Sequence, residues 1–124
     1  MPRMATQAAA VASTLAAETA VVTLPGITVQ AASPVDLVGV LDFTEGTAGT
    51  AVTVRIRRGV DTTGTLIATF GPFPLAAAAR GCFPWMFRDQ QNVDVANQSY
   101  TVTTQQTAAT GNGTANTATI RADY

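Results

Sequence analysis

Histidine and lysine are both absent from this 124-residue sequence, and cysteine occurs once, at Cys82. Without an imidazole, neither Cys82 nor any serine has the general base that usually activates a nucleophile, and lysine-based covalent catalysis is excluded as well. One cysteine and no histidine cannot supply the four ligands of a zinc site, and a single thiol cannot close a disulfide within the chain. Glycine patterns of the Walker or dinucleotide-binding type are also missing, so we expect no metal and no cofactor.

Charged residues are scarce. They make up 12% of the sequence, about half of the ~25% that is typical of soluble domains. The seven basic residues, all of them arginine, are outnumbered by eight acidic ones, which gives a net charge of -1. Because a nucleic-acid-binding domain needs a basic surface, we predict that the protein has no nucleic-acid partner.

Carboxylates are the remaining side chains that could perform acid–base catalysis. The sequence has eight: Glu18, Asp36, Asp42, Glu45, Asp61, Asp89, Asp94 and Asp123. Most fall in predicted turns, where aspartate caps local backbone N–H groups, and none has the spacing of an EF-hand loop. We therefore predict that the protein is not an enzyme, and an enzyme that uses carboxylates alone stays a third hypothesis.

Long hydrophobic runs are missing as well. No apolar stretch approaches the ~20 residues that are needed to span a bilayer. The alanine-rich start of the chain is interrupted by polar residues such as Gln7, Ser13 and Glu18, which argues against an export signal. We predict no membrane partner and no signal peptide.

The stretch from Gly39 to Gly59 has the clearest strand pattern. Its second half alternates between an apolar face and a polar face: Val52, Val54 and Ile56 against Thr53, Arg55 and Arg57. The turn-forming segment 44–49 separates it from the apolar run at 38–43. The pattern predicts a long antiparallel hairpin with strands at 35–43 and 51–58.

Short strand patterns punctuated by glycine and proline continue along the rest of the chain. They lie at residues 19–24, 27–31, 65–70, 81–88, 100–106 and 114–122. The last two are predicted to form a second hairpin through an Asn-Gly turn at 110–113, with Ala118, Ile120 and Ala122 inward. Such spacing predicts an all-β fold, an antiparallel β-sandwich or jelly roll of about seven to eight strands. We expect this domain at residues 19–124, preceded by an alanine-rich N-terminal arm at 1–18 that is either helical or extended.

Three arginines are candidate interface residues. Arg55 and Arg57 share one face of a predicted strand, and Arg58 follows them. They could form a solvated outer face that discourages edge-to-edge aggregation. They could also contact another subunit, because arginine is enriched at interfaces and pairs bidentately with carboxylates.

The segment 81–88 has the densest aromatic content, and Pro84 predicts that it is an edge or bulged strand. Phe83, Trp85 and Phe87 could be core residues. Successive side chains of a strand point to opposite faces, however, so either these three or the set Cys82, Met86 and Arg88 must face outward. Outward aromatic residues could pack on another chain or stack on a sugar ring.

The segments FTEGTAGTAVTVRIRRG and SYTVTTQQT, with the closing GTANTATIRA, resemble the small jelly-roll virion proteins of tailed bacteriophages. These include capsid decoration or cement proteins and head-fibre or tail modules. The closing strands are also similar to those of trimeric TNF/C1q-like jelly rolls. The resemblance covers about residues 35 to 122 and implies a homotrimeric or capsid-bound part without catalysis.

The leading functional hypothesis is therefore a non-enzymatic virion structural protein. Large side chains are few, so its core is thin, and a partner subunit would complete it. It is expected to form a homo-oligomer, with a trimer as the first hypothesis, and to bind the major capsid protein or another virion protein. The expected location is the virion, after assembly in the host cytoplasm. The alternative is a carbohydrate-binding or adhesive module that uses outward aromatic residues such as Trp85 and Tyr100.

Overall fold

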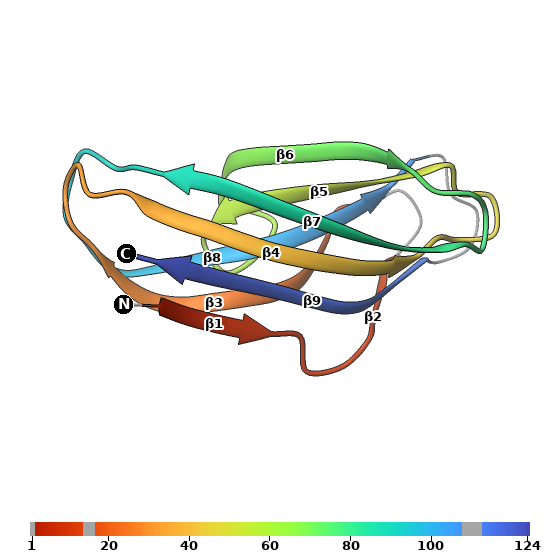
Figure 1. Ribbon diagram of the computed structural model, residues 1–124, viewed down its shortest axis with the longest axis horizontal. Coiled ribbons are helices and arrows are strands. Elements are labelled where there is room, and N and C mark those ends of the chain that lie inside the picture. The colour runs from red at the N-terminus through yellow and green to blue at the C-terminus, as the bar shows by residue number, and fades with distance from the viewer. Residues whose placement is uncertain (1, 14–16, 108–112) are drawn as a thin grey trace.

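A computed structural model describes residues 2–13, 17–107 and 113–124, and within these ranges the chain forms strands and loops without a helix. The strands of the described residues are β1 (Pro2–Thr6), β2 (Val11–Ser13), β3 (Thr19–Val29), β4 (Val35–Thr44), β5 (Ala51–Arg58), β6 (Thr65–Pro74), β7 (Arg80–Asp89), β8 (Val95–Gln106) and β9 (Gly113–Asp123). They form two layers that face each other along the length of the molecule (Figure 1).

The two sheets have the strand order of a jelly roll. Sheet A has the order β1-β9-β4-β7, with β2 also pairing to β9, and sheet B has the order β3-β8-β5-β6. All pairs are antiparallel. From β2 onward, the chain crosses from one sheet to the other at each connection except the β5–β6 hairpin. The predicted fold class, an antiparallel β-sandwich or jelly roll, is confirmed.

The N-terminal segment is extended rather than helical where it is described. β1 pairs with the C-terminal end of β9, at residues 119–123, and β2 pairs with its beginning, at residues 113–115. Together they act as one interrupted edge strand of sheet A. Residues 14–16 lie outside the described residues, and the division of the chain at residue 18 stays a prediction.

Both predicted hairpins are wrong. β4 pairs with β7 and β9, whereas β5 pairs with β6 and β8, so the segment between β4 and β5 links the two sheets instead of closing a hairpin. In the same way β8 lies in sheet B and β9 in sheet A. Alternation of apolar and polar residues identifies a strand and its buried face. Which strands pair depends on how the whole core is buried, and a local sequence pattern carries no information about that. The predicted turn at 110–113 lies outside the described residues except for Gly113.

Edge strands of both sheets contain prolines. β7 is one edge of sheet A and contains Pro84, as predicted, and β6 is one edge of sheet B and contains Pro72 and Pro74. Proline has no backbone N–H for a ladder, so it is tolerated at an edge. The strand predicted at 65–70 is longer than expected, because β6 continues to Pro74.

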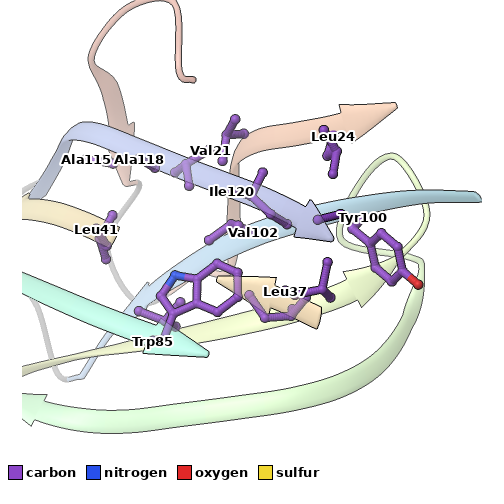
Figure 2. Close-up of a cluster of buried hydrophobic side chains, with 14 of the residues drawn as sticks. Val21, Leu24, Leu37, Leu41, Trp85, Tyr100, Val102, Ala115, Ala118 and Ile120 are labelled. Atoms are coloured by element: carbon purple, nitrogen blue, oxygen red, sulfur yellow. The ribbon is translucent and has the colours of Figure 1, made fainter. Parts of the chain in front are cut away.

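The core lies between the sheets and consists of one face of each long strand. The largest fully buried apolar side chains include Tyr100, Phe43, Leu24, Ile27, Leu37, Leu41, Ile56 and Ile120. Figure 2 shows part of this cluster, in which Trp85 and Tyr100 are the large ring systems. Ala118, Ile120 and Ala122 are buried and face inward, as predicted.

Gly39 makes room for the indole of Trp85. A Cβ atom at Gly39 would overlap both the indole ring and the carbonyl oxygen of Thr119, while Trp85 itself is buried. The central strand of sheet A can therefore accept the indole across its inner face only if residue 39 has no side chain.

We predict that Gly39→Ala lowers the free energy of unfolding by about 1–3 kcal/mol, because the added methyl overpacks the core. The measurement is urea unfolding followed by fluorescence of Trp85, the only tryptophan of the sequence. Val60→Ala, at an exposed apolar residue of the β5–β6 turn, is the control, and its effect should stay within about 0.5 kcal/mol. Equal stability of Gly39→Ala and wild type would contradict this packing.

Candidate functional site

Arg55 and Arg57 lie on the outer face of sheet B, where Glu18 reaches across to both. Arg57 Nε and Nη2 donate to the two carboxylate oxygens of Glu18 at 2.6 and 2.9 Å, and Arg55 Nη1 lies 3.4 Å from Glu18 Oε1. All three side chains are largely buried. The hydrogen bond from Arg57 lowers the pKa of Glu18 below its ordinary value. These arginines are thus engaged within the chain, and their contact with another subunit stays a prediction.

Arg58 points the opposite way, into one end of the core. Its Nε donates to Asp89 Oδ2 at 3.0 Å, its Nη2 donates to Asp89 Oδ1, and Tyr100 Oη donates to Asp89 Oδ2 at 2.7 Å. Asp89 and Tyr100 are both buried. Burial, together with the bond to Asp89, raises the pKa of the Tyr100 hydroxyl. This network closes the core at one end, and an interface role for Arg58 also stays a prediction.

Phe83, Trp85 and Phe87 face inward along β7, and Cys82, Met86 and Arg88 face outward, as their burial shows. Phe70 of β6 stacks on Trp85 with ring centroids 5.8 Å apart, and Phe73 stacks on Phe83 at 4.8 Å. The two aromatic pairs thus join β6, an edge strand of sheet B, to β7, an edge strand of sheet A. They close this side of the sandwich. An interface role for Phe83, Trp85 and Phe87 stays a prediction.

The expectation of outward-facing Trp85 and Tyr100 is wrong. Trp85 is 5% exposed and Tyr100 is fully buried. Tyr100 pairs in register with Leu24 and Arg58, which also point into the core. Strand parity explains the result, since both residues occupy inner-face positions of their strands.

The outer surface of β4 and β7 is apolar, and this surface was not predicted from the sequence. Val38 and Val40 of β4 are 40% and 38% exposed, Met86 of β7 is 72% exposed, and Pro84 is exposed as well. With Gly39, Trp85, Phe70 and Phe73, they line a groove of about 610 Å³. We call Val38, Val40, Pro84 and Met86 the β4–β7 face.

Ion pairs flank the β4–β7 face at both ends. Arg88 Nε lies 2.7 Å from Asp36 Oδ1, and Arg80 Nη2 lies 2.7 Å from Asp42 Oδ2. Each pair joins β7 to β4, and each arginine is mostly exposed. The hydrogen bonds from Arg88 and Arg80 lower the pKa values of Asp36 and Asp42.

The signal for this face was in the sequence. β4 is apolar at inward positions such as Leu37 and Leu41, and also at the outward positions Val38 and Val40. A strand with one solvated face is expected to alternate apolar with polar residues. Apolar residues on both faces indicate that the outer face is covered as well.

Two carboxylates, Asp36 of β4 and Asp123 of β9, are cross-strand partners on the outer face of sheet A, and each is also bound by an arginine. Most are matched with arginine: Glu18, Asp36, Asp42, Asp89 and Asp123. Glu45 is buried in the β4–β5 loop, where its Oε1 accepts the N–H of Gly46 at 2.9 Å. Burial raises its pKa, and no neighbouring carboxylate contributes to the shift. Within the described ranges, no three His, Cys, Asp or Glu side chains gather closely enough to hold a metal ion.

The fold is similar to that of viral capsid proteins. A structure of infectious bursal disease virus, Gt strain, aligns with a TM-score of 0.64 at 15% identity, over 99% of this chain and 33% of that chain. The VP2 subviral particle of the same virus aligns with a TM-score of 0.63 at 15% identity, with the same coverage. The present chain therefore spans about a third of the viral chains. At this identity the likeness shows a viral capsid-type jelly-roll fold and nothing finer.

Other comparisons give no further assignment. A family 35 carbohydrate binding module from Clostridium thermocellum aligns over 97% of both chains at 12% identity, but the TM-score of 0.41 is too low to bear on function. The sequence matches no protein-family model and no curated protein. In the part of the chain that the structure describes, no helix is long and apolar enough to cross a membrane.

We predict that Glu18→Gln destabilises the protein at neutral pH by about 0.5–1 kcal/mol, the scale of a partly exposed ion pair. The folded-state pKa of Glu18 is lowered, so its stabilisation exists above the ordinary value of 4.5 and is lost as the pH falls through the folded-state value. Urea unfolding at several pH values should show the wild-type advantage shrinking below about pH 4.5. A difference that does not depend on pH would contradict the ion pair.

We also predict that Asp89→Asn lowers the free energy of unfolding by about 2–3 kcal/mol at pH 7, because a buried charged acceptor of three hydrogen bonds is lost. Thermal and urea unfolding measure the loss. Asp123→Asn, which removes an exposed ion pair with Arg121, is the matched control and should remain close to wild type. Similar effects of the two substitutions would argue against the buried network.

Proposed function

We propose that this protein is a non-enzymatic structural protein of a virion, which works by packing against other protein chains. The observation that carries the proposal is the exposed apolar β4–β7 face on a viral capsid-type jelly roll. An exposed apolar patch on a soluble domain marks a contact surface. Five of the eight carboxylates, including the cross-strand neighbours Asp36 and Asp123, are bound by arginine, which supports a function without catalysis.

The finer assignment is a capsid decoration or cement protein of a tailed bacteriophage. It would form a homo-oligomer, a trimer as the sequence resemblance implies, and would bind the major capsid protein in the virion. Structures with the same fold include infectious bursal disease virus particles, which supports an assembled state. Burial of apolar surface at about 25 cal/mol per Å² would then add stability to each subunit.

The alternative, a carbohydrate-binding or adhesive module, depended on two aromatic residues that were expected to face outward. Trp85 and Tyr100 are buried, so neither offers a ring face to a sugar. Among the residues that the structure describes, no other contact favours this function, and we expect a glycan array to show no sugar-dependent binding.

Static light scattering on the purified protein tests the proposal. The expected mass is a multiple of one chain, and three chains in the case of the trimer. In a second step, the protein is mixed with purified tailed-phage capsids that lack decoration protein, and saturable co-sedimentation is expected. A folded monomer that stays in the supernatant would overturn the proposed function.

A further inference from the structure

The residues of β4 and β7 that face outward are matched row by row. Asp36 lies opposite Arg88, Val38 opposite Met86, and Val40 opposite Pro84, while Asp42 is bound by Arg80 two residues beyond its direct partner Cys82. The first row therefore joins an acidic residue of β4 to a basic residue of β7, the next two join apolar residues, and beyond them Arg80 reaches Asp42 diagonally.

This arrangement is complementary to itself. A two-fold axis parallel to the strands and midway between β4 and β7 would lay β4 of one copy over β7 of the other without changing the rows. Asp36 would then face Arg88 of the second copy, and Asp42 would face Cys82, with Arg80 two residues further along the same strand. The apolar rows between them, which include Val38 and Met86, would cover one another.

We propose that the β4–β7 face is an isologous two-fold contact between two copies of this chain, packed sheet on sheet. The inference rests on the proposed function in that it assumes a self-associating structural protein. A C2 contact uses the same patch on both subunits and requires such self-complementarity. Aligned sheets pack about 10 Å apart through interdigitating side chains, and the exposed Met86 can enter the groove beside Val38 and Val40.

Other modes of association fit less well. Strand addition at β7 or at β6 meets Pro84 or the pair Pro72 and Pro74, which lack a backbone N–H. A two-fold axis perpendicular to the strands would instead lay β7 over β7, which places Arg88 over Arg80 and Asp36 over Asp42. Like charges across an interface cost several kcal/mol, so the charges select the parallel axis. The contact can coexist with a trimer formed through another surface, because it uses only the outer side of sheet A.

A charge exchange between copies tests the proposal. Asp36→Arg gives a chain with positive side chains at both position 36 and position 88. Arg88→Asp gives a chain with negative side chains at both positions. Each variant alone should self-associate at least about 100-fold more weakly than wild type. Light scattering should then show half the wild-type mass. Mixed in equal amounts, the two variants should restore the wild-type mass, with both chains in a 1:1 ratio by native mass spectrometry.

Two further variants separate association from folding. The double variant D36R/R88D restores opposite charges in every copy and should regain the wild-type mass by itself. Met86→Glu places a charge in the centre of the face and should halve the mass. Val60→Glu changes a similarly exposed apolar residue in the β5–β6 turn and should not. Circular dichroism on each variant verifies that it is folded.

The outcomes separate this contact from the function on which it rests. A wild-type protein that is monomeric in solution overturns both the contact and the self-association in the proposed function. A wild-type oligomer whose mass survives D36R, R88D and M86E overturns the contact alone. Failure of the equal mixture to associate, when both variants are folded and dissociated, also overturns it.

Discussion

An apolar core between two sheets is the feature on which the rest of the structure depends. Each long strand places alternate side chains into it, and polar groups close it at both ends. At one end Arg58 and Tyr100 bind Asp89, and at the other the N–H of Gly46 is bound by Gln106 and by Glu45. Because buried polar groups must find partners, these closures define where the core ends and leave its middle to apolar side chains.

The two outer faces of the sandwich differ, and this difference directs the functional interpretation. On sheet B, threonines and two arginines lie outward, and Glu18 binds both arginines. On sheet A, the outward positions of β4 and β7 are apolar in the middle and charged only at the ends. The outward arginines of sheet B are thus paired within their own chain, whereas the outer side of sheet A presents apolar surface to solvent. A protein that acts by contact would use the second kind of surface.

Much of the fold could be predicted from the sequence. The alternation of Val52, Val54 and Ile56 with their polar neighbours identified β5 and its buried face, and Pro84 identified an edge strand. The hairpins could not be predicted in this way. β4 and β5 are joined by a short turn-like segment, yet β4 finds its partners at Phe87 and Ala122, far along the chain. The candidate site was missed for a related reason, because the outward exposure of Val38 and Met86 depends on which side of sheet A faces the second sheet.

The sequence alone determined the fold class of the protein, an antiparallel arrangement of strands, and the buried face of most of those strands. These follow from local covalent geometry and residue type, which a sequence states directly. The tertiary structure decided which strands pair, that Arg58 and Trp85 turn inward, and that Asp36 and Arg88 stand side by side. These depend on how two sheets bury their surfaces together, which is a property of the whole chain and is absent from any single segment.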